Sequence, residues 1–285
     1  MQISVDRRSV LIGGAAVLGL AAAGAVINLR HRALPREPGL VGHWTFDDAQ
    51  GNAVLDSSGL ANDGLILPLG LADESKWGAG DFAGTVKLSG GGDNFVRIPP
   101  SDSLNTIRSS VTAAAYVFNR AAWTPASPTD GFVAIVQRQW RTALHPDLFY
   151  LGFGVEQGVQ YYKWHLGLVG SEVSLDRLPP GQTGPKANAW VHVAGTYDSD
   201  KGEMALYVDG EQIGLQPAKG DIRLDDGSFD RPLAIGAELN TASLDDASGE
   251  FDGYIDDVRL YGRALDAASI KALAEQASAT RGSHP

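Results

Sequence analysis

The amino-acid sequence predicts an all-β protein: a two-sheet antiparallel sandwich with a short C-terminal helix, preceded by an N-terminal hydrophobic signal or anchor helix. Three observations lead to this fold class. The chain has 285 residues, with 35 Gly and only 8% aromatic residues, which is typical of a turn-rich β protein. From residue 40 onward, short apolar runs alternate with Gly, Asp, Asn and Pro. No helical period persists until the end of the chain.

The first element is a hydrophobic segment that differs from the rest of the chain. Ser9–Ile27 carries no charge and has arginines on both sides. A helix of this length would measure about 28 Å, close to the hydrocarbon thickness of a bilayer. Residues 1–35 therefore indicate an export signal or a membrane anchor with its linker, and both a cleaved signal and a retained anchor stay open. A buried core helix is the weaker alternative, because the segment is apolar on all sides.

The residues before this segment point to export. Arg7-Arg8, followed by Ser9-Val10-Leu11, resembles a bacterial twin-arginine signal, although Asp6 and Val10 depart from that motif. We therefore expect the protein in the bacterial cell envelope, periplasmic or extracellular, in contact with the membrane only through this segment. Without residues 1–35 the chain loses four arginines and one aspartate, so its formal charge changes from −11 to −14.

The next elements are short strands, each an alternating run bounded by turn residues. The runs that we expect to be strands are Leu40–Phe46, Thr85–Leu88, Asn94–Ile98, Val111–Phe118, Phe132–Gln137, Leu148–Val155, Val159–Val169, Trp190–Tyr197, Glu203–Val208, Glu211–Gln216, Pro232–Ile235 and Glu250–Tyr261. Asp209-Gly210 favours a two-residue hairpin, because a type I′ turn needs positive φ at both positions. No Pro-, Gly- or Ser-rich linker divides the region, so we expect residues 36–277 to form one domain.

The last element is a helix. Asp266 is placed to cap a helix over Ala267–Gln276, with Ile270, Leu273 and Ala274 on one face. Residues 278–285 are expected to be a flexible tail.

Composition excludes several classes of function. The chain has no Cys, which excludes disulfides, a thiolate nucleophile and Cys-ligated metal sites. It has no run of basic residues and a net charge of −11. Because phosphate binding needs a concentrated basic face, we expect no nucleic-acid partner.

Several motifs along the domain are similar to those of a known family and occur in the same order. They are Leu40-Val-Gly-His-Trp-Thr-Phe-Asp-Asp48, Asp56-Ser-Ser-Gly-Leu-Ala-Asn-Asp-Gly64, Val111-Thr-Ala-Ala-Ala-Tyr-Val117, Trp190-Val-His-Val-Ala-Gly-Thr-Tyr-Asp198, Leu206-Tyr-Val-Asp-Gly210 and Phe251-Asp-Gly-Tyr-Ile-Asp-Asp-Val-Arg-Leu-Tyr-Gly-Arg-Ala-Leu265. The chain resembles the laminin-G-like jelly rolls of the concanavalin A-like lectin/glucanase superfamily, in the bacterial branch related to pentraxins. The resemblance implies a jelly-roll sandwich of two curved antiparallel sheets.

The last strand carries two adjacent carboxylates. Strict alternation would place the side chain of Ile255 on one face of the strand and those of Val258 and Leu260 on the other face. A β-bulge at Asp256-Asp257 would return all three apolar side chains to the core and re-aim the carboxylates.

The resemblance also implies a structural calcium ion, held by Asp56, Asn62 and one of Asp256 or Asp257. Oxygen ligands without His or Cys are the donor set that calcium takes. The alternative is that Asp56 and Asn62 form Asx-turns and that Asp256 caps the backbone or pairs with Arg259.

Aromatic residues are the candidate ligand contacts, because aromatic rings stack on the apolar faces of sugars. The candidates are Trp140, Tyr161, Trp164 and His165. We expect Trp140 on the surface, in a loop over Gln139–Asp147. Trp164 alternates with Tyr162 and Leu166, so a core position is equally compatible with the sequence.

Catalytic motifs are incomplete in this chain. Glu250-Phe-Asp252 begins the carboxylate pattern of the superfamily's glucanases, but no second Glu follows. Gln160–His165 offers the residue types of jelly-roll lyases without their spacing. The sequence thus favours an exported, non-catalytic domain that binds a carbohydrate or another cell-surface ligand. A polysaccharide lyase or hydrolase and a protein-interaction module of an envelope assembly are the alternatives.

Overall fold

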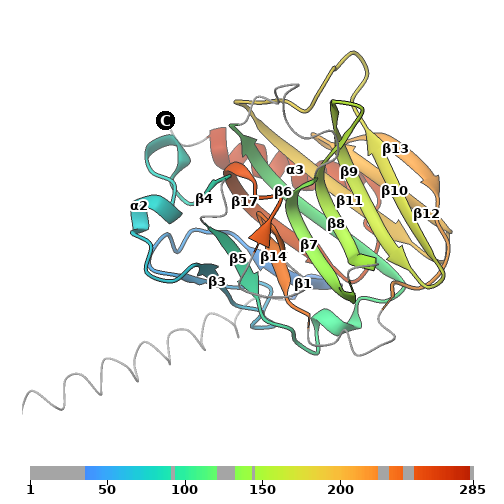
Figure 1. The fold of residues 1–285 in the computed structure, drawn as a ribbon, viewed down its shortest axis with the longest axis horizontal. Helices are drawn as coiled ribbons and strands as arrows, with labels where there is room; N and C mark the ends of the chain where they lie inside the picture. The colour runs from blue at the N-terminus through green and yellow to red at the C-terminus, as the bar shows by residue number, and fades with distance from the viewer. Residues whose placement is uncertain are drawn as a thin grey trace, which may run out of the picture.

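The computed structural model describes residues 36–90, 94–120, 132–142, 145–223, 231–239 and 247–282. Most of the described strands belong to two antiparallel sheets that face one another (Figure 1). The expected hydrophobic segment of residues 1–35 lies outside the described residues. No described helix has the length and hydropathy needed to cross a membrane.

The seven-stranded sheet is built from both ends of the domain. Its order is β1 (Leu40–Trp44), β17 (Asp252–Tyr261), β6 (Ser110–Asn119), β11 (Trp190–Asp198), β12 (Glu203–Val208) and β13 (Glu211–Pro217), and β4 (Val86–Ser89) also pairs with β17. The pairing of β1 with β17 places the first expected strand beside the last one. The Asp209-Gly210 hairpin is confirmed, with φ of 51° and 79° at the two turn residues.

The eight-stranded sheet lies opposite. Its order is β10 (Ser171–Arg177), β9 (Val159–Leu168), β8 (His145–Glu156), β7 (Phe132–Thr142), β14 (Leu233–Ile235), β5 (Phe95–Ile98), β3 (Gly64–Leu67) and β2 (Ala53–Val54). A two-stranded ribbon, β15 (Glu238–Leu239) with β16 (Ala247–Ser248), completes the described strands. All twelve expected strands are present, and the sequence missed β2, β3, β10, β15 and β16.

The remaining elements are helical. They are α2 (Asp73–Lys76), two 3-10 turns at Gly80–Phe82 and Leu104–Thr106, and α3 (Ala267–Gly282). Ile270, Leu273 and Ala274 of α3 are buried, as expected. Asp266 accepts a hydrogen bond from the Ser269 N–H at 2.8 Å, which caps the helix. Because α3 continues to Gly282, the tail expected from residue 278 is wrong for residues 278–282.

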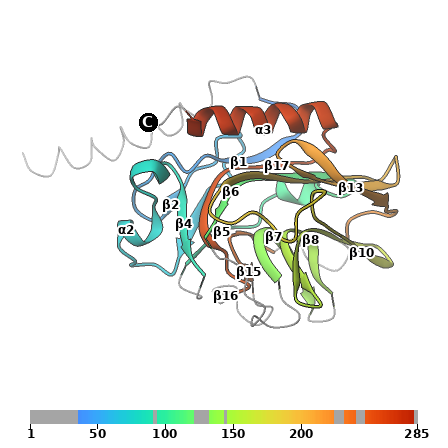
Figure 2. The same cartoon turned by 90° about the horizontal axis from the view of Figure 1, so that it is seen from above.

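The core lies between the two sheets and contains the inward-facing side chains of both. Trp44, Val193 and Leu206 come from one sheet, and Phe149 and Trp164 from the other. Figure 2 shows α3 on the opposite side of the seven-stranded sheet, away from this core. There it buries a second, smaller apolar cluster with Ala194, Tyr207 and Tyr261.

Candidate functional site

The expected calcium loop is centred on Asp56, which follows β2 and is fully buried. Its Oδ1 accepts hydrogen bonds from the backbone N–H groups of His43 and Ser58, at 2.9 and 2.8 Å. Its Oδ2 accepts bonds from the Ser58 hydroxyl at 2.7 Å and the Asn62 N–H at 2.9 Å. A carboxylate has about four acceptor positions, so protein donors use the whole capacity of Asp56.

Asn62 is held in the same way. Its Nδ2 donates to the Val41 carbonyl at 2.7 Å and to Ser103 at 2.9 Å. Its Oδ1 accepts from the hydroxyls of Ser101 and Ser103, at 2.6 and 3.1 Å. Its backbone carbonyl accepts from the Trp44 indole N–H at 2.8 Å. Asn62 therefore joins the loop to β1 and to the turn at residues 101–103.

The two adjacent carboxylates of β17 lie at the expected β-bulge. The register between β17 and β6 shifts between Asp256 and Arg259, and Asp257 has φ of 46°. The bulge brings Ile255, Val258 and Leu260 into the core together, which confirms the expectation. Asp256 Oδ1 accepts the Asp257 N–H at 2.8 Å, so this carboxylate caps the bulge.

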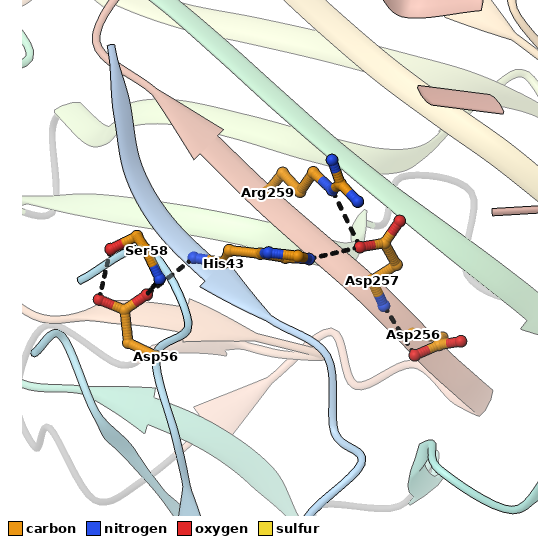
Figure 3. Close-up of polar contacts among 6 residues, drawn as sticks. All are labelled: His43, Asp56, Ser58, Asp256, Asp257 and Arg259. Carbon is orange, nitrogen blue, oxygen red and sulfur yellow. Dashed lines mark hydrogen bonds and ion pairs between the residues drawn. The ribbon is translucent and has the colours of Figure 1, made fainter. Parts of the chain in front are cut away.

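His43 connects the two acidic segments, as Figure 3 shows. Its backbone N–H binds Asp56, while its Nε2 lies 2.6 Å from Asp257 Oδ1. The same oxygen accepts from Arg259 Nε at 2.9 Å. Burial raises the pKa of Asp257, but the hydrogen bond from His43 and the charge of Arg259 outweigh burial and lower it to about 2. Arg259 thus binds Asp257, while Asp256 caps the backbone, which is one of the two roles that the alternative to calcium gave it.

These residues do not fit a calcium ion. Asp56 and the Asp256-Asp257 pair lie on opposite sides of His43 (Figure 3), and the oxygens of Asp56 and Asn62 already accept protein hydrogen bonds. Among the described residues, no three His, Cys, Asp or Glu side chains form a metal-binding group. The Asx-turn alternative describes Asp56, because its carboxylate accepts the N–H of Ser58, two residues on. The residues expected to hold calcium form a hydrogen-bonded junction instead.

Two of the candidate ligand residues do not provide an exposed ring. Trp164 is fully buried in the core, with its indole N–H bonded to the Thr196 carbonyl at 3.1 Å. A side chain at Gly195 would collide with the Trp164 ring, so the seven-stranded sheet is shaped around it. The sugar-stacking role expected for Trp164 is wrong in this structure. Trp140 belongs to β7, which continues to Thr142, so the loop expected over 139–147 is wrong; its side chain lies outside the described residues.

Tyr161 and His165 lie together on the outer face of β9. Their neighbours Tyr162 and Trp164 point into the core, and alternation directs Tyr161, Lys163 and His165 outward. All three outward side chains are partly buried. Burial and the nearby charge of Lys163 lower the pKa of His165 to about 4, so the ring is neutral at pH 7.

Residues that the sequence reasoning missed complete this surface. Lys163 Nζ lies 3.0 Å from Asp176 Oδ1 on β10 and 5.2 Å from the centre of the Phe132 ring on β7. Ser174 donates to Asp176 Oδ2 at 2.6 Å. Phe132 is 49% exposed. We call Phe132, Tyr161, Lys163, His165 and Asp176 the outer patch.

A glycine makes room for the outer patch. Gly154 on β8 pairs with Phe132 on one side and Tyr161 on the other. A Cβ at Gly154 would come within 2.9 Å of the Lys163 stem and 3.0 Å of Asp176 Oδ1. The charged pair therefore lies across the bare backbone of β8, between two aromatic positions. Alternation along β9 could have placed Lys163 here, but Phe132 and Asp176 become neighbours only through strand pairing.

Tyr162, which belongs to the lyase-like stretch, is not placed for catalysis. It is buried in the core, and its hydroxyl accepts the Lys186 N–H at 3.2 Å. Burial raises the pKa of Tyr162 to about 12, which makes the phenol a poor general base at neutral pH.

Comparisons with solved structures identify similar folds at low sequence identity. The binding domain of Paraclostridial Mosquitocidal Protein 1 superposes with a TM-score of 0.57 at 16% identity, over 84% of this chain and 52% of that one. The botulinum neurotoxin serotype D ligand-binding domain, in complex with N-acetylneuraminic acid, gives 0.54 at 16% identity, over 84% and 51%. This chain thus spans about half the length of the toxin domains.

A further similar structure is a whole domain. Domain 4 of AbnA, an extracellular GH43 arabinanase from Geobacillus stearothermophilus in complex with arabinotriose, superposes with a TM-score of 0.54 at 19% identity, over 84% of this chain and all of that one. A search of curated proteins gave no match. Residues 90–271, more than half of the chain, match a laminin G family model described as concanavalin A-like lectin/glucanases superfamily. The two facing antiparallel sheets and this match agree, and the chain belongs to the laminin-G-like jelly rolls of the concanavalin A-like lectin/glucanase superfamily.

Proposed function

We propose that this chain is an exported, non-catalytic module that binds a carbohydrate at a cell surface through the outer patch. The observation that carries the proposal is the Lys163–Asp176 ion pair beside the half-exposed ring of Phe132. An aromatic ring stacks on the apolar face of a sugar, while an ammonium and a carboxylate bond its hydroxyls. The outer patch offers these three kinds of group within one surface.

The similar structures support a binding role by analogy of fold. The arabinanase domain is described with arabinotriose and the toxin domain with N-acetylneuraminic acid. Function depends on sites carried by a fold rather than on the fold itself. The analogy therefore supports the class of activity, and the outer patch supports its location.

Export rests on the N-terminal residues. The uncharged stretch Ser9–Ile27 and the preceding Arg7-Arg8 support passage to the bacterial cell envelope, with the domain periplasmic or extracellular. Expression of the full chain in a bacterial host, followed by fractionation, tests this step. We expect the domain outside the cytoplasm, and retention of an Arg7→Lys/Arg8→Lys variant in the cytoplasm; equal export of both proteins would contradict a twin-arginine signal.

A glycan array followed by calorimetry tests the binding site. Arabinotriose and sialylated oligosaccharides are the first probes. We expect Phe132→Ala and Asp176→Asn each to weaken binding at least tenfold, which is about 1.4 kcal/mol. Asp200→Asn, an exposed carboxylate in the β11–β12 turn, is the matched control and should bind as the unchanged protein does.

The alternatives are outcomes of the same experiment. Release of unsaturated or reducing ends from a polysaccharide panel, abolished by His165→Gln, would replace the binding proposal with an enzyme. An array without hits, together with capture of an envelope protein that Asp176→Asn abolishes, would replace it with a protein-interaction module.

A further inference from the structure

A hollow lies on the face of the sandwich opposite the outer patch, beside the start of α3. Its volume is 210 Å³. Thr196 of β11 and Ala205 of β12 are paired in register and form its floor. Helix α3 covers the neighbouring part of this face, where Ala194 and Tyr207 are buried with Ile270. The hollow is therefore the part of the outer face that the helix leaves uncovered.

One end of the hollow is acidic. Asp198 and Glu203 are paired in register between β11 and β12, and both line it. Asp198 Oδ1 accepts the N–H groups of Asp200 and Lys201, and its other oxygen lies 3.5 Å from the Lys201 ammonium. Among the described residues, no hydrogen bond or ion pair reaches the carboxylate of Glu203. Like charges directly opposite on paired strands are destabilising, so this end favours a bound cation.

The other end carries neutral hydrogen-bonding groups. The Tyr207 hydroxyl donates to Gln212 Oε1 at 3.3 Å, and both residues line the hollow. Burial raises the pKa of Tyr207, so the phenol remains a donor at neutral pH. Asp266, the cap of α3, forms part of the wall. The lining thus combines three carboxylates and one ammonium with a phenol, an amide and a threonine hydroxyl.

We propose that this hollow binds a small hydroxylated amine of the amino-sugar class. The excess of carboxylates selects a protonated amine, and the unpaired carboxylate of Glu203 is its nearest partner. Tyr207, Gln212 and Thr196 supply partners for hydroxyl groups, and the small floor residues leave space for one sugar ring. The site is separate from the outer patch, because the two lie on opposite faces of the sandwich.

Titration of the ¹⁵N-labelled domain with glucosamine, followed by NMR, tests this proposal, and glucose is the uncharged control. We expect glucosamine to shift the amide signals of Thr196, Ala205 and Tyr207, with at least tenfold weaker binding of glucose. Glu203→Gln should weaken glucosamine binding about tenfold. Glu275→Gln, which removes an exposed charge from α3, is the matched control and should have no effect.

A second variant fills the hollow without changing its charge. Ala205→Leu should abolish binding while the domain stays folded, as judged by its other amide signals. Equal binding of glucose and glucosamine, or full binding by Glu203→Gln and Ala205→Leu, would overturn the proposal. Shifts at Tyr161 and Lys163 in place of Thr196 and Tyr207 would also overturn it, and would leave the function proposed for the outer patch standing.

Discussion

The outer faces of the two sheets differ in what covers them. On the seven-stranded sheet, α3 packs Ile270 and Leu273 against an apolar surface that includes Ala194 and Tyr261. On the eight-stranded sheet, β9 directs Lys163 and His165 outward, where they stay partly buried and Lys163 pairs with Asp176. Both sheets use the same alternation. Outward-facing strand positions are thus apolar where a helix packs over them, and they carry charged or polar side chains where no helix does.

We expect the largest effect from weakening the contact between α3 and the outer face of the seven-stranded sheet, which we call the closed face. Ile270 of α3 is fully buried against the sheet, so Ile270→Ala should lower the free energy of unfolding by about 2 to 5 kcal/mol. The measurement is equilibrium unfolding in urea. Lys271→Ala is the control: its ion pair with Glu211 is exposed, and its loss should cost less than about 1 kcal/mol. Equal effects of the two changes would mean that α3 does not stabilise the sheet.

Each outer face also carries a histidine, which allows a second comparison. His192 lies on the face toward α3 and His165 on the opposite one, and burial lowers both pKa values from 6.5 to about 4. Between pH 6.5 and pH 4, the two histidines therefore bind protons in the unfolded chain but not in the folded domain. The free energy of unfolding should fall as pH drops from 6.5 toward 4, by up to about 3 kcal/mol for each histidine.

Urea unfolding at several pH values measures this slope, and His192→Gln and His165→Gln should each flatten it. The surroundings of His192 include Asp209, Asp257 and Arg259, and those of His165 include Lys163, Glu172, Asp176 and Arg223. Because both pKa values fall to about 4, the two variants should flatten the slope by similar amounts. An unchanged slope in the His192→Gln variant would contradict a neutral, buried ring on the closed face.

We expect a smaller effect on stability at the outer face of the eight-stranded sheet, which we call the open face. Lys163 and Asp176 keep 14% and 24% of their side-chain exposure, so water only partly screens their attraction. The Asp176→Asn variant would keep a side-chain oxygen that can accept from Lys163 and Ser174, so we expect it to lower the free energy of unfolding by about 1 to 2 kcal/mol, less than Ile270→Ala. Thermal unfolding of the variant beside the unchanged protein provides the measurement. A loss as large as that of Ile270→Ala would place the ion pair among the structural elements and remove it from the proposed binding surface.

Alternation and turn chemistry were sufficient to predict most of the fold. The apolar spacing around Asp256-Asp257 predicted a bulge that the structure confirms, because only a bulge returns Val258 and Leu260 to the core beside Ile255. The strand β10 was missed because Ser171–Arg177 has only Val173 and Leu175 as apolar residues. An edge strand of this kind carries too little hydrophobic signal to separate it from a turn.

The site was harder to predict, because its contacts join residues that are distant in the sequence. Trp164 was open to two interpretations, and the pairing of Tyr162, Trp164 and Leu166 on one face decides for the core. The outer patch joins Phe132 to Asp176 across three strand pairings. The donors that saturate Asp56 and Asn62 include the backbone of His43 and the hydroxyls of Ser101 and Ser103. Residue types can suggest a metal site, but only the fold shows which donors reach it first.

The smallest expected effect concerns calcium, and it extends the comparison to the junction at Asp56. Like the closed face, this junction is occupied by the protein itself. Protein groups supply the hydrogen-bond partners of its carboxylate and amide. A ligand that binds only the folded state raises the unfolding temperature. Since a calcium ion would have to displace the four donors on Asp56, we expect the same Tm in excess calcium chloride and in excess EDTA. Asp56→Asn should destabilise the domain equally in both media, because the loss is one of hydrogen bonds to the carboxylate. A Tm that rises with calcium in the unchanged protein and not in Asp56→Asn would show that the ion outcompetes these donors. The junction would then be a ligand-binding site.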